Sequence, residues 1–268
     1  MAWVLQPFVS SSRPPRTRRR GRCTRPSIVS ALPNRAATRL SPQQLRLYLV
    51  ADVEYTQQRV RASLESIVER ALQSGCVTAV QLRDKRNCTR ATLATGRVLL
   101  HLCRQAGTYF LVNDRVDVAA ALGADGVHLG QDDMPPSLAR QLLPPTSILG
   151  MSAGNAAEVD EVLRYRDAES GAYLVDYIGA GPVYATGSKV DAGAAIGITG
   201  LQQVAQRAAP LPVVAIGGIH ADHAAACVQS GGVQGVAVLS AILGADDPAQ
   251  AARHIAQAIR PAHRASSR

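Results

Sequence analysis

The feature that most constrains the fold is an alternation of strand-type and helix-type segments that repeats eight times. The apolar runs typical of strands span residues 47–51, 79–82, 109–112, 126–129, 147–151, 177–183, 213–219 and 236–242. Between them, apolar residues recur at the helical period, as in Val60, Leu64, Ile67, Val68, Ala71 and Leu72. Strict βα alternation of this length predicts an α/β fold with a parallel sheet closed into a single (β/α)8 TIM barrel.

A doubly wound open sheet is the alternative architecture. Such a sheet usually has fewer strands and a glycine-rich dinucleotide turn after the first one, whereas residues 51–54 contain no glycine. The pattern gives no sign of a second domain. We therefore expect a disordered basic leader over residues 1–40, the barrel over residues 41–262 and a short tail over residues 263–268.

The leader differs sharply in composition from the rest of the chain. Residues 1–40 hold nine arginines and no acidic residue, and most of these arginines follow a short apolar start. This composition is typical of an organelle transit peptide, because a secretory signal would place its basic residues before the apolar segment. We expect import into a plastid, with a mitochondrion as the alternative; a disordered basic arm is the competing interpretation.

The charge of +9 comes from this leader, because the remaining chain has 20 cationic and 20 acidic residues. We therefore expect no nucleic-acid-binding surface. No apolar run approaches the ~20 residues of a membrane span, so we expect no membrane association. Five widely spaced cysteines without a CxxC pair predict reduced thiols. A homo-oligomer is compatible with the sequence.

Acidic turns follow two neighbouring strand-type runs within residues 110–135. Asn113 and Asp114 follow the first run, and Asp132 and Asp133 follow the second. Parallel neighbours lie ~5 Å apart, so both turns should share one rim. Helix capping explains either turn alone, but the two together favour a cation held by Asp114 and Asp133. Oxygen ligands without clustered His or Cys favour Mg²⁺ over zinc, and His128 is interpreted as a core histidine.

Cationic side chains follow another strand-type run. Gln81, Arg83 and Lys85 alternate, so they should point the same way and favour an anionic ligand. The alternative is a solvated strand end with Arg83 paired to a local acid. Lys85 and Lys189 are the two lysines of the chain, which suggests that both positions need a compact ammonium for phosphate, with chance as the alternative explanation.

A loop of small residues, 179–189, carries Thr186 and Ser188 and could bring backbone amides to a phosphate. Gly217 and Gly218 end the seventh strand-type run, and Ser240 lies near the end of the eighth, where barrels usually bind phosphate. Tight packing is the alternative explanation for the glycines. Two anion subsites on one rim would fit two phosphorylated small molecules. No Ser-His-Asp set or activated cysteine supports covalent catalysis.

The motifs also resemble those of a known family in their order. These are LYLVAD, VQLRDK, LVND, GADGVHLGQDDMP, ILGMSA, DYIGAGPVYATGSK, VVAIGGI and GVAVLSAI, between about Arg46 and Ala258. Over this span the chain resembles thiamine phosphate synthases, transferases that join a hydroxymethylpyrimidine diphosphate to a hydroxyethylthiazole phosphate. The resemblance implies a Mg²⁺-assisted dissociative substitution that yields thiamine phosphate and pyrophosphate.

The resemblance also implies a role for each matching residue. The residues implied to bind the pyrimidine diphosphate are Gln81, Arg83, Lys85, Asn113, Ser152 and Lys189. The catalytic residues among them are Arg83, Lys85, Ser152 and Lys189. Asp114 and Asp133 are implied to hold Mg²⁺. The residues implied to bind the thiazole phosphate are Thr186, Ser188, Gly218, Leu239 and Ser240.

The chain departs from the family pattern in two places. Residues 185–188 read ATGS where the family more often has a Pro-Thr-x-Thr run, and the segment from Ile219 to Ser240 is about one residue longer than in typical bacterial members. That longer segment and residues 195–200 look more like plant members, which are often fused to a pyrimidine kinase. Two other functions stay open: a thiazole tautomerase-like isomerase and a non-catalytic phosphometabolite-binding barrel.

Overall fold

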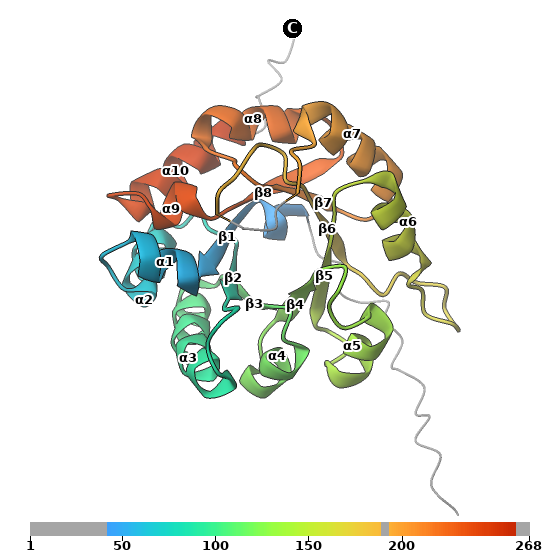
Figure 1. Cartoon of the computed structure of the whole chain (residues 1–268), viewed down its shortest axis with the longest axis horizontal. Helices are drawn as coiled ribbons and strands as arrows, with labels where there is room; N and C mark the ends of the chain where they lie inside the picture. The colour runs from blue at the N-terminus through green and yellow to red at the C-terminus, as the bar shows by residue number, and fades with distance from the viewer. Residues whose placement is uncertain (1–41, 189–192, 261–268) are drawn as a thin grey trace, which may run out of the picture. The chain divides into compact units, whose positions relative to one another are not determined.

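The computed structural model describes residues 42–188 and 193–260. Eight parallel strands form a closed barrel in sequence order, and helices surround it (Figure 1). The predicted (β/α)8 barrel is therefore confirmed. The leader over residues 1–40, Lys189 and the tail over residues 263–268 lie outside the described residues, so the predicted domain boundaries stay predictions.

The strands are β1 (Leu47–Asp52), β2 (Ala79–Arg83), β3 (Tyr109–Asn113), β4 (Gly126–Leu129), β5 (Ile148–Ala153), β6 (Tyr177–Ala180), β7 (Val213–Ile216) and β8 (Val233–Val238). The helices are η1 (Pro42–Leu45), α1 (Val53–Arg59), α2 (Leu64–Leu72), α3 (Thr89–Ala106), α4 (Val116–Leu122), α5 (Pro136–Leu142), α6 (Ala156–Arg164), α7 (Gly197–Ala208), α8 (Ala221–Gln229), α9 (Ser240–Leu243) and α10 (Pro248–Ala258). None of the helices in the described part combines the length and apolarity that crossing a membrane would require.

The core has two parts because successive strand residues face opposite sides of the barrel wall. Leu47 and Leu49 of β1 pack outward under the helices, whereas Tyr48 and Val50 point into the barrel. Pairing of β1 with β8, which aligns Tyr48 with Ala237, closes the barrel. The interior cluster forms a floor, and the strand ends above it are free to carry polar side chains.

Two helix starts follow the expected capping chemistry. The Asp247 carboxylate accepts hydrogen bonds from the backbone amides of Ala249 and Gln250, and Pro248 opens α10. The Asn155 side chain caps α6, and the Glu158 carboxylate reaches back to the backbone amide of Gly154 at 2.7 Å. Asn155 and Glu158 therefore form a capping pair, in which Glu158 accepts from the backbone amide of Gly154.

Several predicted element bounds are wrong. Strand β8 begins at Val233 and ends at Val238, and the apolar run continues as helix α9 from Ser240. Strand β7 stops before Gly217, whose φ of 98° turns the chain away from extended geometry. Val60 is the C-cap of α1 and does not belong to α2. Apolar periodicity does not mark where one buried element ends and the next begins.

Candidate active site

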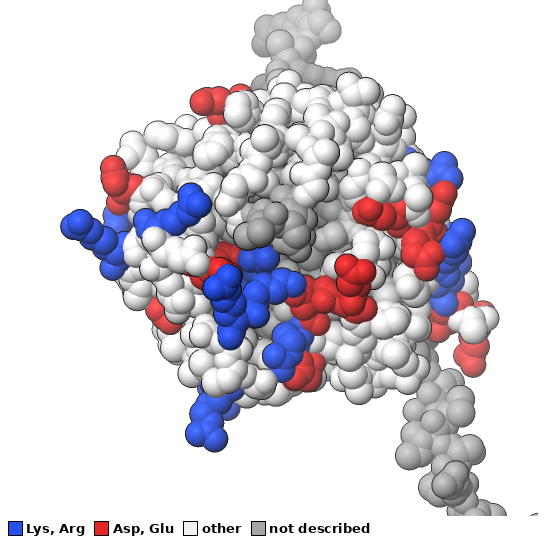
Figure 2. Space-filling view, in the orientation of Figure 1, with Lys and Arg blue, Asp and Glu red and all other residues white. Residues whose placement is uncertain are grey.

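The carboxyl ends of the strands surround a cavity of about 730 Å³. Residues from all eight strands contribute to its lining, and its volume is in the ~300–1,000 Å³ range of small-molecule sites. In Figure 2, Lys and Arg side chains adjoin Asp and Glu side chains near the middle of the face that Figure 1 looks down on. The cavity therefore lies at the face where barrel enzymes place their active sites.

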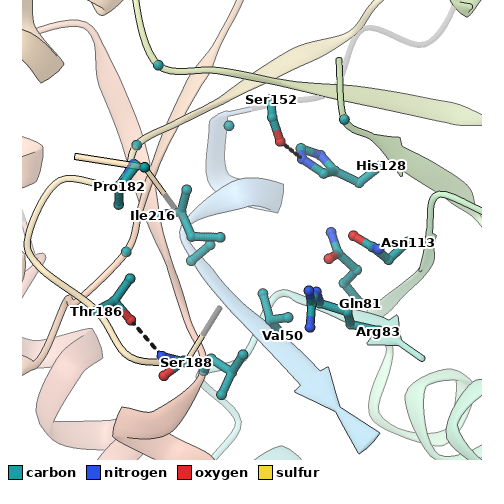
Figure 3. A pocket seen from close by; sticks show the side chains of 18 of the residues that line it. Val50, Gln81, Arg83, Asn113, His128, Ser152, Pro182, Thr186, Ser188 and Ile216 are labelled. Carbon is teal, nitrogen blue, oxygen red and sulfur yellow. Dashed lines mark hydrogen bonds between the residues drawn. The ribbon is translucent and has the colours of Figure 1, made fainter. Parts of the chain in front are cut away.

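The structure brings the predicted site residues together at this cavity. Twelve of the thirteen line it: Gln81, Arg83, Lys85, Asn113, Asp114, Asp133, Ser152, Thr186, Ser188, Gly218, Leu239 and Ser240. The thirteenth, Lys189, lies outside the described residues. Figure 3 shows Gln81, Arg83 and Asn113 on one side of the cavity and Thr186 with Ser188 on another. The ligand that each residue binds stays a prediction.

The acidic turns after β3 and β4 meet as predicted. The Lys85 ammonium forms an ion pair with the Asp114 carboxylate, and Asp114 lies beside the Asp133 carboxylate. Asp133 also accepts a hydrogen bond from the backbone amide of Gly130 at 2.6 Å. Burial raises the pKa of Asp133, and the neighbouring Asp114 carboxylate raises it further. A cation bound at this corner of the cavity would favour the ionised form of Asp133.

The backbone of Asp114 is held in an uncommon conformation. Its φ is 62°, and its amide donates to the carbonyl oxygen of His128 at 2.8 Å, which ties the end of β3 to β4. Left-handed backbone at a non-glycine residue persists where the surroundings enforce it, often at functional sites. The bond to His128 thus holds the Asp114 carboxylate at the cavity edge.

The donor set at Asp114 and Asp133 fits Mg²⁺. The described residues hold no group of three or more His, Cys, Asp or Glu side chains suited to a metal. Mg²⁺ is commonly held by one or two carboxylates together with waters and substrate phosphate oxygens. Two adjacent carboxylates at the edge of an open cavity leave room for those other ligands.

Asp52 is a site residue that sequence reasoning missed. Its carboxylate is buried, forms an ion pair with Arg83 and accepts from the backbone amide of Tyr55 at 2.7 Å as the cap of α1. The alternative interpretation of Arg83, pairing with a local acid, is thus correct, and Arg83 still lines the cavity. An acid directly between a strand and a helix is the signal that could have identified Asp52.

His128 is buried and hydrogen-bonded, as expected of a core histidine, but it also lines the cavity. Its Nε2 lies 3.0 Å from the Ser152 hydroxyl, and its Nδ1 lies 2.9 Å from the Tyr177 hydroxyl. The interpretation as core alone was therefore incomplete. Asp132, from the same turn as Asp133, also lines the cavity.

The loops after β6 and β7, which were predicted to bind phosphate, are tightly packed. A Cβ on Gly217 would lie 2.6 Å from the Cα of Pro182, and one on Gly181 would lie 2.1 Å from the carbonyl oxygen of Ile216. The loops after β6 and β7 are therefore packed against each other, in agreement with the packing interpretation of these glycines. The backbone amide of Ser188 donates to the Thr186 hydroxyl at 3.2 Å, so these two residues, both predicted to bind phosphate, lie together (Figure 3).

Comparisons with known proteins agree with this arrangement. The family model described as thiamine monophosphate synthase matches residues 47–242. The thiamine-phosphate synthase of Azorhizobium caulinodans is 45% identical over 223 residues, which are 83% of this chain and 99% of the relative. The thiamine-phosphate synthase of Archaeoglobus fulgidus is 42% identical over 216 residues, or 81% and 94% of the two chains.

A solved structure also supports this relationship. The thiamine phosphate pyrophosphorylase of Pyrococcus furiosus superimposes with a TM-score of 0.68 at 36% sequence identity, covering 81% of this chain and 96% of that one. A 3-hexulose-6-phosphate synthase, at 16% identity and a TM-score of 0.54, shares the fold alone. On its sequence, its barrel and the match over residues 47–242, the chain belongs to the thiamine monophosphate synthase family.

Proposed function

We propose that the protein is a thiamine phosphate synthase, a transferase that joins hydroxymethylpyrimidine diphosphate to hydroxyethylthiazole phosphate. The observation that carries the proposal is one cavity with two different sides, in a chain 45% identical to a curated synthase. One side has the ion pair of Lys85 with Asp114, and another has the hydroxyls of Thr186 and Ser188. A diphosphate and a monophosphate can therefore bind in the same cavity.

The charged side suits departure of pyrophosphate. As the bond between the pyrimidine methylene carbon and the diphosphate oxygen breaks, its electron pair leaves on that oxygen. Arg83 and Lys85 face the developing negative charge, and fixed charges of this kind lower the barrier without reorganising. Asp114 and Asp133 would hold Mg²⁺, which when bound supplies further positive charge to the phosphate oxygens. Lys189 is proposed as a third cation.

The second half of the reaction forms the carbon–nitrogen bond. The electron-rich aminopyrimidine stabilises the methylene cation until the thiazole nitrogen donates its electron pair. Capture of this cation by water would give the alcohol, so water must be kept out. Val50 and Ile216 contribute apolar side chains to the cavity wall (Figure 3), which helps to exclude it.

An isomerase of the thiazole tautomerase type is the second candidate. Such an enzyme would use the phosphate loops but would not need the set of Gln81, Arg83, Lys85 and paired aspartates. The ion pair of Lys85 and the adjacent carboxylates of Asp114 and Asp133 favour the transferase. A non-catalytic phosphometabolite-binding barrel is the third candidate.

Metal removal tests the proposed transferase. With both substrates and Mg²⁺ we expect thiamine phosphate, detected by chromatography, and EDTA should abolish its formation until excess Mg²⁺ is restored. Isomerisation of a thiazole carboxylate phosphate without thiamine phosphate would favour the second candidate. Binding of both compounds without any turnover would favour the third.

We also propose that residues 1–40 direct import into a plastid. The support is compositional, since the segment holds nine arginines and no acid. A fusion of residues 1–40 to a fluorescent protein should collect in plastids of a plant or algal cell. Replacing Arg18, Arg19 and Arg20 with Glu should leave the fusion in the cytosol. Fluorescence that stays cytosolic with the natural segment would refute import, and mitochondrial fluorescence would refute the plastid assignment.

A further inference from the structure

Five polar side chains from five different strands form one continuous hydrogen-bonded chain across the barrel interior. The Gln81 amide nitrogen donates to the Tyr48 hydroxyl at 2.9 Å, and the Tyr48 and Tyr177 hydroxyls lie 3.0 Å apart. The Tyr177 hydroxyl lies 2.9 Å from His128 Nδ1, and His128 Nε2 lies 3.0 Å from the Ser152 hydroxyl. Both ends of this relay, Gln81 and Ser152, line the cavity.

The two tyrosines lie beneath the cavity floor. Tyr48 and Tyr177 are 2% and 1% exposed, and neither contributes to the cavity lining. Burial raises the pKa of Tyr48 to about 12 and the pKa of Tyr177 well above its usual value. Each phenol is therefore neutral at physiological pH and has a single hydrogen to donate.

Two glycines leave room for the Tyr177 and His128 rings of this relay. A Cβ on Gly150 would lie 2.1 Å from the Tyr177 ring, and one on Gly179 would lie 3.0 Å from the His128 ring. The Tyr177 and His128 rings stack with centroids 5.4 Å apart and planes inclined by 30°. Two glycines facing the barrel interior thus leave the space in which the hydroxyl of Tyr177 reaches both Tyr48 and His128.

The direction of each hydrogen bond follows from the donors available. The Gln81 amide nitrogen can only donate, so the Tyr48 oxygen accepts there. The hydrogen of Tyr48 then goes to Tyr177, because Gln81 and Tyr177 are the hydrogen-bond partners of its hydroxyl within residues 42–188 and 193–260. Tyr177, accepting from Tyr48, gives its own hydrogen to His128 Nδ1. His128 Nδ1 therefore accepts, and the hydrogen of the ring that faces Ser152 lies on Nε2.

We propose that Tyr48 and Tyr177 are positioning residues that fix His128 as the Nε2–H tautomer and thereby turn the Ser152 hydroxyl hydrogen toward the cavity. Ser152 accepts from Nε2–H, so its own hydrogen is available to a ligand. Gln81 donates to Tyr48 and keeps its amide oxygen as an acceptor. The cavity thus offers a fixed donor, the Ser152 hydroxyl, and a fixed acceptor, the Gln81 amide oxygen. A neutral aminopyrimidine complements this pattern. This role rests on the proposed synthase function.

Nitrogen NMR on the ligand-free protein tests the relay without reference to activity. With ¹⁵N-labelled histidine at neutral pH, we expect His128 to show a protonated Nε2 and an unprotonated Nδ1. A His128→Asn variant assigns its signals among the six histidines of the chain. In Tyr48→Phe and Tyr177→Phe the single tautomer should give way to a mixture, because Nδ1 no longer has an obligatory donor. A His128 protonated at Nδ1, or variants that keep the natural tautomer, would overturn the proposal.

Kinetics test whether the relay matters for the substrate. Tyr48→Phe should lower kcat/KM for the pyrimidine substrate about tenfold, as expected for losing the orientation of one hydrogen-bond donor. The matched control is Tyr173→Phe, which removes a hydroxyl that accepts from Arg166 at 2.6 Å in the surface loop before β6; its kcat/KM should be unchanged. An unchanged kcat/KM in Tyr48→Phe would overturn the positioning role. Absence of product with the natural protein would instead refute the synthase function, and the tautomer would still be decided by NMR.

Discussion

Lys85→Ala and Asp114→Asn should each lower the rate of thiamine phosphate formation by at least about a hundredfold while the barrel stays folded. The Lys85 ammonium pairs with Asp114 at the edge of the cavity, and the Lys85 side chain is 42% exposed, so its removal leaves the core intact. Asparagine is the sharper replacement for Asp114, because it tolerates the φ of 62° there and removes only the charge. Steady-state rates and circular dichroism measure both effects.

A neighbouring cation provides the matched control. Arg86 forms an ion pair with Glu54 at 3.0 Å and does not line the cavity, so Arg86→Ala should keep the rate within about twofold. Lys85→Arg should restore only part of the rate, since a planar guanidinium does not replace a compact ammonium at a phosphate. Near-normal turnover by folded Lys85→Ala protein would contradict the assignment of Lys85 to the leaving group.

Arg140→Met should reduce the free energy of unfolding by about 3 kcal/mol, the cost of removing one partner of a buried ion pair. Arg140 is 6% exposed and donates to the carbonyl oxygens of Leu174 and Ser147 at 2.8 and 2.5 Å. It also pairs with the Asp176 carboxylate at 2.6 Å. It therefore ties α5 to the chain entering β5 and β6, far from the catalytic rim.

Urea unfolding followed by circular dichroism measures this loss. The control is Arg207→Met, which removes an exposed ion pair with Asp160 and should leave the free energy of unfolding nearly unchanged. Since Arg140 does not line the cavity, the folded Arg140→Met protein should keep its catalytic rate. Equal losses of stability in the two variants would contradict a structural role specific to Arg140.

The barrel and the position of the site could be predicted because both follow from local patterns. Eight alternating segments leave few architectures, and the carboxyl ends of parallel strands meet at one rim. Asp114 and Asp133 could therefore be placed together from the turns in which they lie, and the structure confirms that they adjoin. The predicted end of β8 was wrong because the apolar run continues through Leu239 into α9.

The relay and its surroundings could not be predicted, because they depend on which side chains meet across the barrel. Tyr48 and Tyr177 lie in apolar strand segments and look like ordinary core residues in the sequence. The contact between their hydroxyls joins residues 129 positions apart. Arg140 lies on a short helix, where a charged residue is normally solvated, and its partners come from other segments. No local periodicity encodes such long-range contacts.

The most direct test of the proposed synthase function is a ³¹P NMR record of the protein with pyrimidine diphosphate, thiazole phosphate and Mg²⁺. One pyrophosphate should appear for each thiamine phosphate formed, and omitting the thiazole phosphate should suppress thiamine phosphate entirely. Signals of the two substrates that persist unchanged with protein and Mg²⁺ present would contradict the account.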